Sequence, residues 1–85
     1  MEKEITIHIS EDQTIIELSS LLQPYRAEIY LQKRDESNIV EVNLKSFLGL
    51  ITMRLQNGDK VNVRTEGEDA QSALEAVVNY LTKGE

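Results

Sequence analysis

The chain has 85 residues, of which 9 are Lys or Arg and 15 are Asp or Glu, so it carries a formal charge of −6; 40% of its residues are apolar and none is cysteine. One domain of this length, spanning residues 1–85, buries only about 60–65% of the surface of its unfolded chain, which leaves little room for the deep pocket of an elaborate enzyme. The acidic balance disfavours nucleic acid and membrane surfaces as partners, and the missing cysteine excludes disulfides, a thiol nucleophile and Cys-ligated zinc.

The first predicted element is a strand over residues 4–9. Its apolar side chains fall on every second residue, so Ile5, Ile7 and Ile9 share one face and are expected in the core. The same alternation places His8 on the opposite, open face of the sheet, away from any helix N-terminus.

A helix is predicted next, from residue 11 or 12 to Gln23. Three side chains able to accept a bond from a free helix amide stand near its start: Ser10, Asp12 and Thr14. Pro24 ends the helix, because proline lacks an amide hydrogen and disfavours helical geometry in the residue before it.

Two strands are predicted over residues 26–32 and 40–44, with Val40, Val42 and Leu44 expected to face inward. The loop between them, at about 33–38, holds four charged residues and no apolar one. Such a loop suits a solvated hairpin connection.

A short helix is predicted over residues 47–55, with Ser46 as its N-cap and Asn57-Gly58 as its C-terminal cap. This segment holds more apolar side chains than one stripe of a short helix can bury. Several of them are therefore expected at the surface.

A strand over about residues 59–66, with Val61 and Val63 expected to face inward, is followed by a last helix whose apolar stripe runs from Ala70 to Leu81. Glu66, Glu68 and Asp69 at the start of this helix and Lys83 at its end match the signs of the helix dipole, each contributing ~0.3–1 kcal/mol. The order of elements predicts an α+β open-faced sandwich, in which a four-stranded antiparallel sheet carries three helices on one face.

Three stretches of the chain resemble the HPr proteins of the sugar phosphotransferase system: residues 42–51 (VNLKSFLGLI), 57–63 (NGDKVNV) and 66–70 (EGEDA). The resemblance runs from about Tyr25 to the C-terminus, and the HPr fold has the predicted order of elements. In HPr proteins of Gram-positive bacteria, the serine at the position of Ser46 is phosphorylated by a dedicated ATP-dependent kinase and then helps a transcriptional corepressor complex to form. The resemblance therefore implies a regulatory serine here, with a serine kinase and a transcriptional regulator as partners.

The phosphocarrier half of the HPr pattern has no counterpart. Family members carry Gly-Ile-His-Ala-Arg-Pro-Ala at the start of the first helix, whereas residues 10–16 of this chain read SEDQTII. A phosphohistidine needs an imidazole beside amides and a cation that hold the phosphoryl group, and Glu11 and Asp12 would repel it. His8, the single histidine, would have to be the phosphoacceptor, but an ordinary surface residue is the favoured interpretation.

An exposed apolar patch with a polar rim indicates a protein-binding site, and the resemblance points to Phe47, Leu48 and Ile51 as its residues. A homodimer contact or plain exposure are the alternatives for this patch. At Ser46, capping and phosphorylation are compatible, because a helix N-terminus favours an anion.

No pattern predicts a catalytic residue, a cofactor or a metal site. The acidic residues at 35–36 and 66–69 lack the spacing of a calcium loop, and there is no glycine-rich phosphate loop. The first residues lack the apolar run of a signal peptide, and no apolar run approaches the length that spans a membrane, so a cytoplasmic protein is expected.

The leading hypothesis is an HPr-like regulatory protein of carbohydrate metabolism, not an enzyme, that has lost phosphocarrier activity and acts through protein contact. Ser46 would be its phosphorylation switch. One alternative is a phosphocarrier with an unconventional acceptor, either His8 or a carboxylate such as Asp12. The other is an interaction module on the same fold whose serine is never modified; the oligomeric state stays open.

Overall fold

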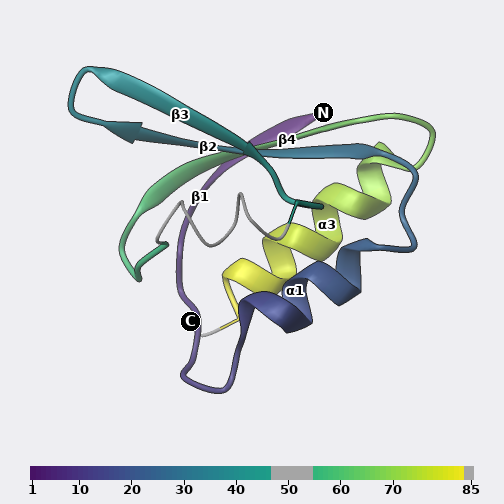
Figure 1. Ribbon diagram of the computed structural model, residues 1–85, viewed down its shortest axis with the longest axis horizontal. Coiled ribbons are helices and arrows are strands. Elements are labelled where there is room, and N and C mark those ends of the chain that lie inside the picture. Colours follow the sequence, from purple (N-terminus) through teal and green to yellow (C-terminus); the bar gives the residue numbers. More distant parts are fainter. Residues whose placement is uncertain (47–54, 84–85) are drawn as a thin grey trace.

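The computed structural model describes residues 1–46 and 55–83. Within them the elements are, in chain order, β1 (Glu2–Thr6), α1 (Ile15–Leu22), β2 (Glu28–Asp35), β3 (Asn38–Asn43), β4 (Lys60–Glu66) and α3 (Ala70–Leu81). The strands form one antiparallel sheet in the order β1-β4-β2-β3, and α1 and α3 cover one of its faces (Figure 1). The predicted open-faced α+β sandwich is confirmed with two helices, because most of the third, predicted at 47–55, lies outside the described residues.

The core lies between the sheet and the two helices. The central strands β2 and β4 alternate as predicted, so that Ile29, Leu31, Val61 and Val63 are all buried. Helix α3 turns one stripe toward them: Ala70, Ala73, Leu74, Val77, Tyr80 and Leu81. Each large apolar side chain buried in this way contributes about 1.5–3 kcal/mol.

β1 and α1 are both displaced from their predicted bounds. Ile5 and Ile7 are buried as expected, but the strand ends at Thr6, after which single backbone bonds tie Ile7 to the loop before β4. Helix α1 begins only at Ile15, because residues 10–13 form a turn of their own and Thr14, rather than Ser10 or Asp12, is the N-cap. Its end agrees with the prediction, since Leu22 is the last helical residue before Gln23 and Pro24.

The β2–β3 hairpin is longer than predicted. Pairing continues through Lys33↔Val40, Arg34↔Ile39 and Asp35↔Asn38, so the predicted loop at 33–38 shrinks to a turn at residues 36–37. The hairpin extends past the helices (Figure 1), so neither of its faces is buried at this end. For the same reason Val40 is 42% exposed rather than part of the core.

The acidic residues around the start of α3 do not act as predicted. Asp69 occupies the N-cap position but makes no side-chain cap; its carboxylate accepts the N–H groups of Arg26 (2.9 Å) and Ala27 (2.7 Å) instead. The first turn of α3 contains no acidic residue and its last turn no basic one. Asp69 therefore holds the chain before β2 against α3 instead of capping the helix through its side chain.

Candidate functional site

The segment before α1 is a closed turn. The N–H of Ser10 donates to the side-chain oxygen of Gln13 (2.8 Å), and the N–H of Gln13 donates to the Ser10 carbonyl (3.1 Å). The side-chain amide of Gln13 donates in turn to the Tyr80 carbonyl in α3 (2.6 Å). Residues 10–13 are thus held in place by the last turn of the other helix.

Two side chains of the protein, Thr14 and Tyr80, bond backbone groups at the start of α1. The Thr14 hydroxyl oxygen accepts the N–H of Glu17 (3.0 Å), which makes it a side-chain cap. The N–H of Thr14 donates to the Tyr80 hydroxyl, which donates to the Thr14 carbonyl, both at 3.0 Å. Burial raises the pKa of Tyr80, so this hydroxyl keeps its proton and stays a donor.

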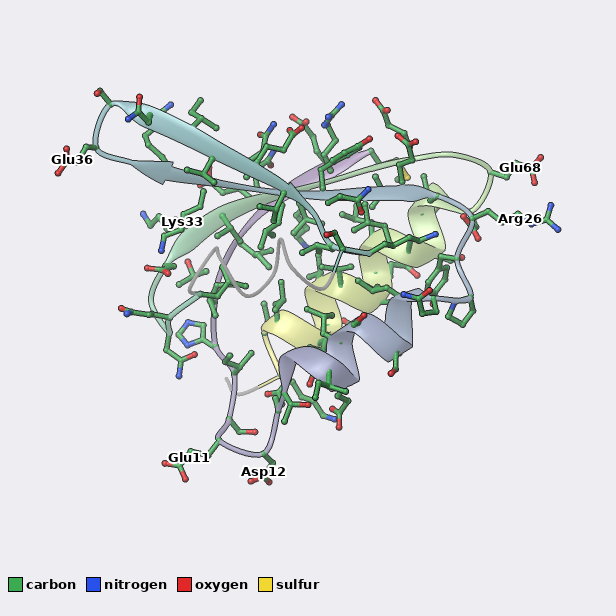
Figure 2. All side chains as sticks on the ribbon, viewed as in Figure 1. Glu11, Asp12, Arg26, Lys33, Glu36 and Glu68 are labelled. Atoms are coloured by element: carbon green, nitrogen blue, oxygen red, sulfur yellow. The ribbon has the colours of Figure 1, made fainter. Side chains whose placement is uncertain are left out.

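The charge at this end of α1 is negative. Glu11 and Asp12 are exposed and point into solvent from the tip of the turn (Figure 2). A helix N-terminus favours an anion through its free amides and its dipole, but two carboxylates beside it oppose a further negative group. This position is poorly suited to receive a phosphoryl group.

Ser46 stands at the end of a fixed turn that follows β3. Its N–H donates to the Asn43 carbonyl (2.9 Å), and the N–H of Lys45 donates to the side-chain oxygen of Asn43 (2.9 Å). Leu44 between them is fully buried, and its N–H donates to the Ile29 carbonyl (2.8 Å). The Ser46 residue itself is exposed, so the core positions the backbone while the serine faces solvent.

Lys45 brings a cation next to this serine in the chain. Its ammonium group donates to the Tyr25 carbonyl, just beyond α1. Its charge also contributes to lowering the pKa of Asp69, after the larger effect of the bond from the Arg26 N–H. Sequence reasoning did not identify this link, because the bonded residues are 20 positions apart and no local pattern joins them.

The predicted partner-binding residues Phe47, Leu48 and Ile51 lie outside the described residues. Their role therefore stays a prediction. Within the described ranges, no group of three or more His, Asp or Glu side chains is arranged to hold a metal ion. No helix described here has the length and apolar character needed to cross a membrane.

A family model described as "PTS HPr component phosphorylation site" matches residues 2–83. The chain belongs to the HPr family. This confirms the resemblance seen in the sequence and extends it to the N-terminal third, where the histidine motif is missing.

Relatives of this HPr-family protein include a phosphocarrier protein and HPr-like proteins called Crh. It is 30% identical over 81 residues to the HPr-like protein Crh of Halalkalibacterium halodurans, a match covering 86% of this chain and 96% of the relative. It is 32% identical over 60 residues to phosphocarrier protein HPr of Lysinibacillus sphaericus, which covers 71% and 64% of the two chains. Among solved structures, HPr of Bacillus anthracis superposes with a TM-score of 0.81 at 25% identity, over 95% of each chain.

His8 does not stand at a helix N-terminus in this HPr-family protein. It lies beyond the end of β1, is half-buried, and its N–H donates to the Leu81 carbonyl at the end of α3 (2.8 Å). The C-terminal end of a helix is its negative end, which disfavours an anion.

A shallow groove of about 530 Å³ runs between α1 and α3, lined by Glu17, Leu21, Ala76, Asn79, Tyr80 and Lys83. Leu21 is 40% exposed on the edge of this groove. Tyr80, which bonds Thr14, lines the groove, whereas Ser46 does not. No sequence signal indicated it, because it depends on how the two helices pack.

Proposed function

We propose that this HPr-family protein is a regulator of carbohydrate metabolism that acts in the cytoplasm through protein contact, with Ser46 as its phosphorylation switch and without phosphocarrier activity. The observation that carries the proposal is the start of α1, where the Thr14 hydroxyl accepts the N–H of Glu17, and Glu11 and Asp12 supply negative charge. A phosphocarrier needs the opposite arrangement of an imidazole, free amides and a cation.

The description of one relative supports the regulatory role. Crh of Bacillus subtilis is 32% identical over 57 residues, and a structure of it is described as the catabolite repression containing protein Crh. That structure shares the fold of this chain, with a TM-score of 0.70.

The phosphorylation step is an ordinary group transfer from ATP. The Ser46 oxygen forms a bond to the γ-phosphorus, the bond between the β- and γ-phosphates breaks, ADP leaves, and the hydroxyl proton passes to a base of the kinase. The product adds about −1.5 to −2 charges beside Lys45 and beside the proposed contact residues Phe47, Leu48 and Ile51. Such a charge changes which partner surface fits, because it favours a basic rim and penalises an acidic one.

The test uses two kinases on the intact protein. With an HPr-type serine kinase and ATP, we expect one phosphate per chain, located at Ser46 by mass spectrometry and lost in Ser46→Ala. Ser37→Ala is the matched control, because Ser37 is an exposed serine in the hairpin turn. With phosphoenolpyruvate and the general kinase of the phosphotransferase system, we expect no hydroxylamine-sensitive phosphoryl group; stoichiometric labelling of His8 or Asp12 would refute the proposal.

A further inference from the structure

We propose that the outer edge of β3 pairs with the same edge of a second copy of this chain, in an antiparallel arrangement with its two-fold axis at Val40. The two sheets would join into one across this edge. The inference is independent of the proposed function, because it uses neither Ser46 nor the segment that follows it.

The two edges of the sheet differ in how they are protected. β1, at one edge, has the sequence EKEIT, so charged side chains cover most of its length. β3, at the other edge, has the sequence NIVEVN, with Glu41 as its one charged residue. Arg64 binds that carboxylate at 3.4 Å within the same molecule. Proteins normally shield free edges with charge or proline, so among the described strands β3 is the edge with the least such protection.

Two apolar side chains of β3 stand in solvent, one on each face of the hairpin. Ile39 is 63% exposed and Val40 is 42% exposed. Figure 1 shows why, since the hairpin carries this part of β3 beyond both helices. A strand with exposed apolar groups on both faces and an open backbone edge is suited to strand pairing.

The register of β3 shows which backbone groups point outward. Leu44 donates to the Ile29 carbonyl and is in register with β2, and backbone groups alternate in direction along an antiparallel strand. The even-numbered residues of β3 therefore face β2, and Ile39, Glu41 and Asn43 face outward. The Asn43 carbonyl already accepts the N–H of Ser46. Ile39 and Glu41 remain as the residues with outward N–H and carbonyl groups.

One register of two copies uses these groups and no others. With Val40 opposite Val40 of the second copy, Ile39 faces Glu41 of the other copy on both sides of the axis, and their N–H and carbonyl groups make the bonds of two hydrogen-bonded pairs. Shifting the register by two residues places Glu41 opposite its own copy, and directly opposed like charges are destabilising. The Val40-centred register also brings two exposed apolar side chains into contact.

The charge of this hairpin permits two copies to approach. Residues 32–43 carry two basic and three acidic side chains, so the contact avoids most of the chain's net charge of −6. Arg34 of β2 pairs with Ile39 of β3, which would in turn face Glu41 of the second copy. The Arg34 side chain would then lie about 10 Å across the face from that Glu41, and the two opposite charges attract. One six-residue strand from each copy forms a small interface, below the about 1,200 Å² typical of stable complexes, so we expect a dissociation constant on the order of 0.1–1 mM.

Disulfide trapping tests the register directly, because the natural chain contains no cysteine. In a non-hydrogen-bonded antiparallel pair the Cα atoms lie about 4.5 Å apart, within the range that a disulfide bridges. Under mild oxidation of the full chain we expect Val40→Cys to form a covalent dimer at least about 10-fold faster than Ile39→Cys or Glu41→Cys, which do not face their own copies. Equal rates for the three variants would overturn the proposal.

Two further variants separate this contact from other self-association. Val40→Lys places like charges opposite each other, so in sedimentation velocity it should stay monomeric at concentrations where the natural chain dimerises. Circular dichroism checks that the exposed position has not altered the fold. Glu4→Cys on β1 is the control for the other edge; a faster cross-link there, or a natural chain that stays monomeric near 1 mM, would overturn the proposal.

Discussion

Single side chains join parts of this protein that are distant in the sequence. The Tyr80 hydroxyl bonds both the N–H and the carbonyl of Thr14, at 3.0 Å each. The Asp69 carboxylate receives two N–H groups from the segment before β2. In both cases the bond holds a loop next to α1 or β2 against α3, so the ends of the elements depend on these residues.

We predict that Tyr80→Phe destabilises the protein by about 1–2 kcal/mol, because it leaves the N–H and carbonyl of Thr14 without their partner at a partly buried position. The control is Tyr25→Phe, which removes a hydroxyl that bonds none of the described residues. Urea unfolding measures both variants. Equal stability of the two would show that the Thr14–Tyr80 bonds contribute nothing.

At the scale of elements, the turn between β4 and α3 has no room for a side chain. Gly67 has a φ of 135°, and a Cβ placed on it would lie 2.9 Å from the Ala27 Cα. Gly58, before β4, has a φ of 93° but has no atom within 4 Å of such a Cβ. The two glycines separate backbone strain from steric overlap.

We therefore predict that Gly58→Ala costs about 1 kcal/mol through strain alone, whereas Gly67→Ala costs ~2 kcal/mol or more, because β2 and α3 must also move apart. The midpoints of thermal and urea unfolding measure the difference. A Gly67→Ala variant as stable as Gly58→Ala would mean that the backbone at Ala27 can move away from the added Cβ at no cost in free energy.

At the scale of the whole molecule, two carboxylates couple stability to acid. The ion pair and hydrogen bond with Lys33, 2.9 Å away, lower the pKa of Asp59. The N–H of Arg26, followed by that of Ala27, lowers the pKa of Asp69. In the unfolded chain an aspartate titrates near about 3.9. Since the folded pKa values are below it, the unfolded state binds more protons in acid, and the stability present above that pH is lost as pH falls through the folded values.

We predict that the free energy of unfolding decreases as the pH is lowered below about 4, and that Asp59→Asn flattens this part of the profile while costing stability at pH 7. Urea unfolding across the acid range measures both effects. Curves for the natural chain and Asp59→Asn that stay parallel throughout would contradict the assignment of the acid response to this ion pair.

Much of the fold could be read from the chain alone, where one buried face imposes a period. The alternation of Val61 and Val63 predicted β4, and the apolar stripe from Ala70 to Leu81 predicted α3. The HPr resemblance came from local segments around Ser46 and Asn57. These signals are local, because an element with one buried face has apolar residues at regular intervals within its own short segment.

Tertiary structure decided where the helices and strands end and which distant residues bond to one another at the site. The hairpin strands continue through residues 33–38 because a ladder of backbone bonds needs no apolar pattern. Tyr80, 66 residues away, bonds the N–H of the α1 N-cap Thr14. The Asp69 carboxylate accepts the N–H groups of Arg26 and Ala27, 43 and 42 residues away, and makes no side-chain cap of its own helix. Bonds between distant residues leave no periodic trace in a sequence; only the packing of α1 and α3 on the sheet brings their partners together.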